Sequence, residues 1–313
     1  MELRQLRYFV AIVDHGSLSR AARVLHIAQP ALTQQIRQLE DEMAAQLLHR
    51  SAQGVIATDA GKVFYEHALA ILKQVQDAKQ AVAQSTDKPS GTVALGIPQS
   101  VSNALALPLL NAVRSIYPEI TLQLTEELTG NLITQLKSGR LNLAVLFDDG
   151  QLSSFAATPM IEEEMMYITR ARSQYGVKGR KGVPLAQAIQ APLILPGLAH
   201  GVRPRIENLV RSQGMSLDNV IEINSVAILK SAILADIGAT ILPVAPLLAD
   251  IERGEMVAHR IAGEQISRTL VLCASRNIPL TTAAAAVEKL VLDVTDALCR
   301  SGQWGHTRVL ERE

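Results

Sequence analysis

Residues 17–40, SLSRAARVLHIAQPALTQQIRQLE, constrain the fold of this chain more than any other stretch. Ser17 is a favourable N-cap for a short helix whose apolar residues recur at helical spacing. After a break at 26–28, Pro30 suits the first turn of a second helix. One face of this second helix is apolar and is predicted to be buried: Leu32, Ile36 and Leu39.

The opposite face of the second helix is polar: Gln29, Thr33, Gln34, Arg37 and Gln38. Such side chains donate and accept hydrogen bonds, which is what reading base edges in a major groove requires. Two helices joined by so short a turn, with the second polar on its outer face, indicate a helix-turn-helix. The spacing alone fits a surface helical hairpin with a solvated face equally well, so the rest of the chain has to decide.

Two short strand-like pieces, 47–50 and 55–58, follow this helix pair around a turn that Gly54 permits. They predict a β-hairpin with Arg50 and Gln53 near its tip. A hairpin beside a helix-turn-helix is a wing, and an arginine at its tip would reach a phosphate or the minor groove.

A long helical pattern then runs from 59 to about 86. Its apolar residues alternate steps of four and three, which is a heptad a/d seam: Phe64, Ala68, Ile71, Val75, Ala78 and Val82. An isolated rod with one apolar seam is poorly stable, so the seam is predicted to pair with a second copy. The alternative is that it packs on its own domain.

Beyond a linker at 87–91, strand-like and helical patterns alternate, which predicts α/β layers with largely parallel sheets in one large or two smaller lobes. Residues 158–170 are interpreted as a passage between lobes. The tail from Ser301 shows no periodicity and is expected to be loosely ordered.

Composition describes a soluble globular protein: 313 residues, 48% hydrophobic and 19% charged, suit two or three domains. No apolar run is long enough for a membrane span, no signal peptide is recognisable, and two cysteines are too few for a disulfide framework. A cytoplasmic location and buried free thiols are therefore expected.

Net charge is zero, and residues 1–58 hold six arginines against five carboxylates. DNA binding would thus depend on individually positioned side-chain contacts, and a multimer would increase the number of phosphate contacts.

The segment LRYFVAIVDHGSLSRAARVLHIAQPALTQQIRQLEDEMAAQLLHR, followed by GVIATDAG, resembles the LysR-type transcriptional regulators. VLHIAQPAL and QLLHR are most similar to their nitrogen assimilation control branch. The resemblance implies a winged helix-turn-helix, a dimerising linker helix, and a two-lobed α/β effector domain shaped like a periplasmic solute-binding protein. It also implies homodimers and homotetramers that bind double-stranded DNA, with RNA polymerase as a further partner.

The implied domains are a DNA-binding domain over 1–58, a linker and dimerisation helix over 59–88, and a regulatory domain over 89–313. Because the chain would cross between lobes twice, lobe I would comprise about 89–161 and 267–300, and lobe II about 162–266. The family's DNA-contacting positions correspond here to the start of the recognition helix and the wing: Gln29, Pro30, Thr33, Gln34, Arg37, Arg50 and Gln53. Thr33 stands where serine is common, and glutamine at 34 prefers adenine edges.

Ligands of α/β sheets bind beyond the carboxyl ends of strands, where helix N-termini present free N–H groups. Several strand-to-helix junctions of this chain are polar, and the resemblance implies that five of their residues line the site of a small anionic or polar effector: Ser100, Ser102, Thr129, Val202 and Asn224. Arg203 is a sixth candidate, which could pair with a carboxylate of the effector or lie on the surface. An equally good interpretation is that Ser102, Thr129 and Ser225 are ordinary N-caps.

No nucleophile elbow, zinc-protease motif, paired-cysteine motif or Walker A motif is present, and the seven histidines show no metal spacing. Neither an enzyme nor a cofactor or metal site is therefore expected, although His200 lies at a polar junction. Two alternatives to a regulator stay open. One is a solute-binding or sensing protein whose N-terminal helices mediate protein contacts, and the other is an α/β enzyme with an added helical domain.

Overall fold

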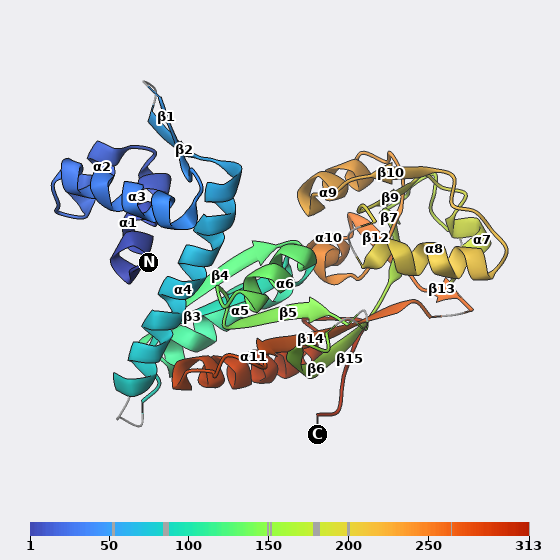
Figure 1. The fold of residues 1–313 in the computed structure, drawn as a ribbon. Helices are drawn as coiled ribbons and strands as arrows, with labels where there is room; N and C mark the ends of the chain where they lie inside the picture. Colours follow the sequence, from blue (N-terminus) through green and yellow to red (C-terminus); the bar gives the residue numbers. More distant parts are fainter. Residues whose placement is uncertain are drawn as a thin grey trace. The chain divides into compact units, whose positions relative to one another are not determined.

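The computed structural model describes residues 1–51, 54–83, 88–148, 150, 152–177, 182–198, 201–263 and 265–312 (Figure 1). The chain forms two compact units. Unit 1 comprises Met1–Ser85 with Lys137–Arg140, and unit 2 comprises Thr86–Leu136 with Leu141–Glu313. No helix in the described ranges is long and apolar enough to cross a membrane.

The helices of unit 1 begin and end where the sequence provides caps. They are α1 (Leu3–His15), α2 (Leu18–Val24) and α3 (Gln29–Met43). Gly16 ends α1 in the left-handed conformation, with φ of 59°. The Ser17 hydroxyl accepts a hydrogen bond from the Arg20 N–H at 3.4 Å, as expected of an N-cap. The predicted helix pair and its turn are confirmed.

The core of unit 1 is built from one face of each helix. Leu32, Ile36 and Leu39 are fully buried, which confirms the predicted stripe of α3. Phe9 of α1 meets Phe64 edge to face, with ring centroids 5.1 Å apart. This packing leaves the opposite, polar face of α3 to solvent.

A hairpin of β1 (Leu48–Ser51) and β2 (Gly54–Ala57) follows α3. Its position is fixed at the corner between α1 and α2, because the Val55 N–H donates to the Gly16 carbonyl at 2.9 Å. Gly54 has φ of 136°, and a Cβ there would lie 2.7 Å from the Gly16 oxygen, so the close approach requires glycine.

Helix α4 (Asp59–Ala83) is the predicted rod. The Thr58 hydroxyl starts it by accepting from the Gly61 N–H at 2.9 Å. The seam changes character along the helix: Ala68 is fully buried, whereas Ile71 is 37% and Val82 87% exposed. The far part of the seam is therefore uncovered in a single chain.

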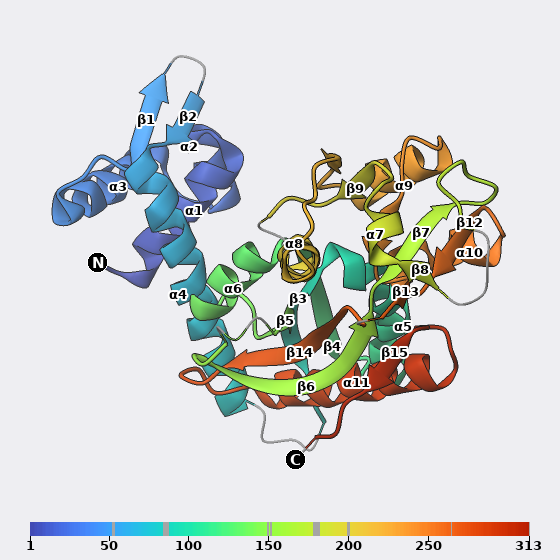
Figure 2. The same cartoon turned by 90° about the vertical axis from the view of Figure 1, so that its right-hand side faces the viewer.

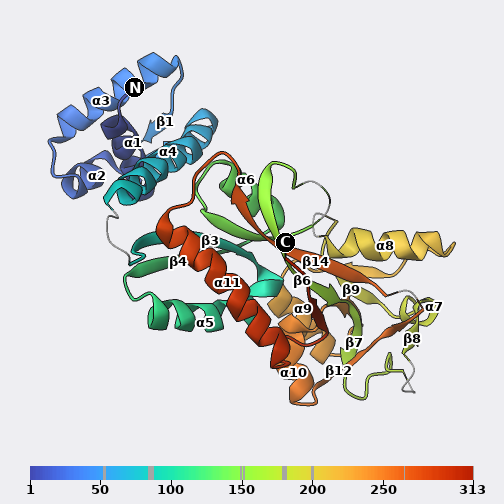
Figure 3. The same ribbon diagram turned by 90° about the horizontal axis from the view of Figure 1, so that it is seen from below.

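Lobe I of unit 2 is a mixed sheet with the strand order β15-β6-β14-β5-β3-β4. Its strands are β3 (Gly91–Pro98), β4 (Ile120–Glu127), β5 (Leu143–Phe147), β6 (Phe155–Glu164), β14 (Ser267–Ser275) and β15 (Thr307–Val309). Helices α5 (Gln99–Ile116) and α11 (Thr282–Arg300) lie side by side on one face (Figure 3), and α6 (Thr129–Lys137) covers the other. The first three strands are parallel as predicted, but β6, β14 and β15 pair antiparallel.

Lobe II has one core made by short strands and helices. Its strands are β7 (Met166–Arg170), β8 (Val183–Pro184), β9 (Leu193–Leu195), β10 (Val220–Glu222), β11 (Thr240–Leu242), β12 (Met256–His259) and β13 (Ile261–Ala262). Its helices are α7 (Leu185–Ala188), α8 (Val202–Ser212), α9 (Val226–Leu234), the 3₁₀ turn η1 (Ala245–Leu247) and α10 (Leu248–Glu252). β11, β7 and β12 form an antiparallel sheet, and β9 pairs in parallel with β10.

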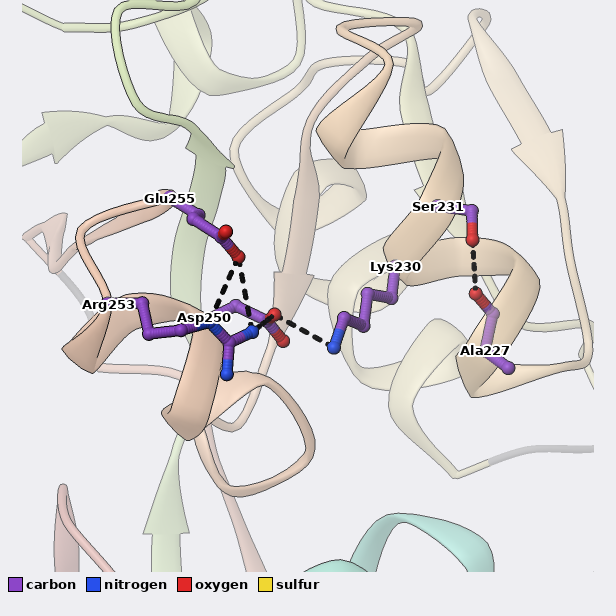
Figure 4. A network of polar contacts seen from close by, with 6 residues as sticks. All are labelled: Ala227, Lys230, Ser231, Asp250, Arg253 and Glu255. Atoms are coloured by element: carbon purple, nitrogen blue, oxygen red, sulfur yellow. Dashed lines mark hydrogen bonds and ion pairs between the residues drawn. The ribbon is translucent and has the colours of Figure 1, made fainter.

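A buried carboxylate joins two helices of lobe II (Figure 4). Asp250 of α10 is 1% exposed, and its carboxylate lies 2.8 Å from the Lys230 ammonium of α9. Arg253 pairs with the same carboxylate and also with Glu255. Two cations thus compensate the burial of this one anion.

Of two expectations about the connections of unit 2, one is wrong. Residues 158–170 do pass between the lobes: they run from the end of β6 in lobe I into β7 in lobe II, and β6 pairs along its length with the returning strand β14 (Figure 2). The tail from Ser301 is not loosely ordered, because Trp304 is 1% exposed and β15 adds an edge strand to β6. A single apolar anchor and backbone pairing leave no periodic signal.

Candidate nucleic-acid interface and ligand cavity

The predicted reading positions of α3 share its solvent-facing side. Gln29, Pro30, Gln34 and Arg37 are exposed and Thr33 is half-buried. The Gln29 side-chain carbonyl accepts from the Ser19 hydroxyl of α2 at 3.3 Å. Thr33, Gln34 and Arg37 make no side-chain hydrogen bond or ion pair to another described residue. Their polar groups are therefore available to an external partner.

The wing residue Arg50 lies on β1, next to the turn of the hairpin. Its guanidinium is 3.9 Å from one carboxylate oxygen of Glu40 in α3. The other oxygen of Glu40 accepts from the N–H groups of Leu47 and Leu48, at 2.8 and 3.1 Å. Glu40 thus fixes the hairpin to the end of α3. Gln53 lies outside the described residues.

The ion pairs of unit 1 leave several of its arginines unpaired among the described residues. Of the acids, Glu2 pairs with Arg4, Glu42 with the N-terminal ammonium, and Asp14 accepts from the Tyr65 hydroxyl. Several arginines have no ion pair to a described carboxylate: Arg7, Arg20, Arg23 and Arg37. Ion pairing does not change the net charge of this unit, but it leaves these four guanidinium groups available to a phosphate backbone.

Unit 2 contains a cavity between its two lobes, with about 610 Å³ of free space including the part open to solvent. Four of the predicted effector positions line it: Ser100, Thr129, Val202 and Asn224. They come from the starts of α5, α6 and α8 and from the segment before α9.

The other two predicted positions do not line this cavity. The Ser102 hydroxyl lies inside α5, where it donates to the Gln99 carbonyl at 2.9 Å and also contacts the Glu126 carboxylate. It is not an N-cap, because α5 begins at Gln99, earlier than predicted. Arg203 pairs with Glu207 at 2.9 Å and Glu222 at 2.8 Å.

The remaining predicted caps differ in their outcome. The Ser225 hydroxyl accepts from the Ile228 N–H at 3.4 Å and caps α9. Thr129 is the first residue of α6. The Asn224 side-chain oxygen accepts from the Gly197 N–H at 2.8 Å, which closes one end of the cavity wall. His200 lies outside the described residues.

The wall of the cavity also holds a buried arginine that the sequence analysis missed. Arg268 of β14 is 3% exposed, and its guanidinium lies 2.6 Å from the Glu163 carboxylate. It also donates to the Ser100 hydroxyl at 3.1 Å and lies over the Phe147 ring, 4.2 Å from the centroid. Nothing in the pattern of β14 distinguished this residue from a solvent-facing arginine.

The partner of Arg268 is itself held from behind. Glu163 is 1% exposed, and its second oxygen accepts from the Trp304 indole N–H at 2.8 Å. A chain of contacts therefore runs from the C-terminal segment through Glu163 and Arg268 to Ser100 at the cavity. Both oxygens of Glu163 accept hydrogen bonds, as a buried carboxylate requires.

The thiols show no sign of redox or metal chemistry. Burial raises the pKa of Cys273 to about 12, so that this thiol is protonated at neutral pH. Burial likewise raises the pKa of Cys299. Among the described residues, no group of three His, Cys, Asp or Glu side chains is placed to hold a metal ion.

Both units match known protein families. Residues 3–62 match the family described as bacterial regulatory helix-turn-helix protein, lysR family, and residues 86–296 match the LysR substrate binding domain. The chain is 37% identical over 297 residues to the nitrogen assimilation regulatory protein nac of Klebsiella aerogenes, which covers 94% of this chain and 95% of that protein. It is 34% identical over 310 residues to the protein of the same name from Escherichia coli K12, and this match covers 97% of this chain and 99% of that protein.

Solved structures share the fold at lower identity. A full-length OxyR variant from Pseudomonas aeruginosa has a TM-score of 0.72 at 18% identity and covers 100% of this chain and 99% of that chain. Full-length CbnR in complex with its target DNA has a TM-score of 0.69 at 21% identity and covers 94% and 100%. These similarities establish the architecture of a helix-turn-helix domain followed by a two-lobed α/β domain.

Proposed function

The chain belongs to the LysR family of bacterial transcriptional regulators, and on this premise we propose how its residues divide between reading DNA and binding a small molecule. It is a DNA-binding regulator with an effector-binding domain. The identities of 37% and 34% with two nac proteins support a nitrogen assimilation control-like branch. We further infer that it has no catalytic activity and works in the cytoplasm, where its DNA partner is.

We propose that α3 enters the major groove and that the hairpin contacts the backbone or minor groove beside it. The residues assigned to DNA are Gln29, Pro30, Thr33, Gln34, Arg37, Arg50 and Gln53. The observation that carries this assignment is the polar face of α3, where Thr33, Gln34 and Arg37 have no partner among the described residues. On an ordinary surface face of the helix, some of these groups would form hydrogen bonds within their own domain.

We assign effector binding to the cavity of unit 2, with Ser100, Thr129, Val202 and Asn224 as its contacts. Ser102 and Arg203 have their polar groups engaged elsewhere and are assigned to holding the starts of α5 and α8. A ligand that binds two lobes changes their equilibrium only through its differential affinity for open and closed arrangements. The effector would therefore have to touch both lobes.

The active species is proposed to be a homodimer joined along α4, and further a homotetramer of two dimers. Its support is the exposed end of the α4 seam, since Ile71 is 37% and Val82 87% exposed in one chain. The proposed working division is 1–58 for DNA, 59–88 for dimerisation and 89–313 for the effector, with RNA polymerase as the partner at the promoter.

Footprinting on DNA upstream of the regulator's own gene tests this function. The wild-type protein should protect a defined site, and Gln34→Ala should lose the preference for that site over random DNA by about 1–3 kcal/mol for each bidentate base contact. Gln38→Ala, on the same helix but outside the assigned set, is the matched control. Failure to protect any fragment specifically, or equal loss with both variants, would contradict the proposal.

A further inference from the structure

A second cavity of unit 2 adjoins the first one, with about 1,230 Å³ of free space that includes open solvent. Four residues line both cavities: Thr129, Phe147, Gly201 and Arg268. Arg205 and Asn208 of α8 line the second cavity only. The two cavities therefore adjoin along these residues, and Arg268 belongs to this junction.

Arg268 is held in one orientation, but not all of its N–H donors have a partner among the described residues. Its Nε donates to Glu163, and its Nη2 lies 2.6 Å from the same carboxylate oxygen and donates to Ser100. No hydrogen bond from its third nitrogen, Nη1, to a described residue is found. Since a guanidinium has five N–H donors, the two on Nη1 have no partner among the described residues, in a side chain that is 3% exposed and lines both cavities.

Arg205 is the second cation at this junction. Its guanidinium donates to two backbone carbonyls, to Asp148 at 2.7 Å and to Ser267 at 3.4 Å. These bonds orient it without neutralising it, and no ion pair to a carboxylate of the described residues is found. Arg205 therefore brings a positive charge to the second cavity that the described chain leaves unbalanced.

The balance of charges in the lining indicates what charge the bound anion carries. The charge of Arg268 is matched by Glu163, so that Arg205 supplies one uncompensated positive charge. The described lining of the second cavity contains no acid, whereas Glu127 lines the first cavity. A group with a single negative charge fits this balance, and a doubly charged phosphate would meet repulsion from Glu127.

The rest of the first cavity is mainly apolar. Its inner surface is formed by side chains from both lobes: Leu128, Ile223, Val226, Leu229, Leu242 and Pro246. Burying an apolar body there would contribute roughly 25 cal/mol for each Å² removed from water. The site therefore combines a seat for an anion with a pocket for a hydrophobic group, as ligand sites commonly do.

Resting on the effector function proposed above, we infer that the effector is a small monocarboxylate with an apolar body. Its carboxylate lies between Arg205 and Arg268, and its body fills the first cavity. Glu163 and Trp304 are positioning residues, because they hold Arg268 in place without touching the ligand. Since Arg205 belongs to lobe II and Arg268 to the strand returning to lobe I, the carboxylate joins the two lobes.

Calorimetric titration and thermal shift of the full chain test this inference with defined probes. The probes are cyclohexanecarboxylate, hexanoate and phenylacetate, each compared with its neutral amide, together with phenyl phosphate, at matched ionic strength. Carboxylates should bind at least about tenfold tighter than their amides, since a charge-assisted hydrogen bond contributes roughly 1.5–3 kcal/mol. Equal binding of acids and amides, or tighter binding of phenyl phosphate, would overturn the monocarboxylate assignment.

Variants of the chain test which arginines bind the carboxylate. Arg205→Gln should weaken carboxylate binding about tenfold or more without changing amide binding, and Arg268→Lys should weaken it while keeping the charge opposite Glu163. Arg211→Gln, an exposed arginine on the same helix, is the control and should change affinity less than twofold. Equal effects at 205 and 211 would overturn the inference. Footprinting of the wild-type protein separates the two proposals: a specific footprint without carboxylate binding rejects the effector class alone.

Discussion

At the scale of single residues, the buried carboxylate of Glu163 connects the strand β14 with the C-terminal segment. Its two oxygens accept from Arg268 and Trp304, residues that are far apart in the sequence, and all three side chains are at most 3% exposed. A buried carboxylate that loses one donor bears the full cost of its desolvation. The C-terminal segment is therefore part of the cavity's support and not an appendage.

Trp304→Phe should destabilise unit 2 by about 1–3 kcal/mol, because it removes the N–H donor but keeps an aromatic ring in the core. Urea denaturation followed by circular dichroism measures this loss. Arg308→Gln is the comparison: its partner Glu162 has a lowered pKa through hydrogen bonds from Ser267 and Arg308, but the arginine is 73% exposed. Its loss should cost less than about 1 kcal/mol. Equal losses would show that the Glu163 network adds nothing beyond surface pairing.

Cys273 should resist thiol reagents in the native protein. Burial raises its pKa to about 12, so that the thiol is protonated at neutral pH. Titration with a chromogenic disulfide should label this residue only after unfolding in urea. Mass spectrometry would locate the label, and rapid native labelling of Cys273 at pH 7 would refute the burial argument.

At the scale of elements, prediction from sequence succeeded where a helix carries its own start and stop. α1, α2 and α3 follow from Gly16, Ser17 and Pro30, because these residues act through local backbone chemistry. α5 begins earlier than predicted, at Gln99, since Pro98 occupies the N-cap position without a side-chain bond. Short strands such as β8 and β13 are set by pairing between distant segments, which periodicity does not register.

The seam of α4 is the element whose partner lies outside one chain. Val75→Lys places a charge in the half-buried middle of the seam, and the dimer should then dissociate at micromolar protein concentration. Analytical ultracentrifugation measures the mass. Gln76→Lys adds the same charge at the next, exposed position and should leave the mass unchanged. An unaltered mass of the Val75 variant would remove the basis for pairing along this seam.

At the scale of the whole molecule, the sequence predicted the order of domains correctly but not what joins their parts. Four of the six predicted effector positions line the cavity, because strand-to-helix junctions of one sheet meet at its edge. Arg268 and Phe147 escaped prediction, since a buried arginine is recognisable only through Glu163, which lies 105 residues away in the chain. The contact between them depends on the antiparallel pairing of β6 with β14.

Whole-molecule electrostatics gives a final prediction about DNA affinity. Each protomer offers Arg7, Arg20, Arg23 and Arg37 without an ion pair to a described carboxylate, and Arg50 with only a 3.9 Å approach to Glu40. If every one of them contacts a phosphate or displaces a counterion, a dimer's binding constant would fall with salt at a logarithmic slope no steeper than about −9. Arg37→Gln should make that slope shallower by about 2, one unit for each protomer, and weaken binding to all sequences alike. Fluorescence anisotropy measures the slope between 50 and 200 mM salt, a range over which the Debye length falls from about 14 Å to about 7 Å. A slope unchanged by Arg37→Gln, together with a loss confined to the specific site, would instead assign Arg37 to a base edge.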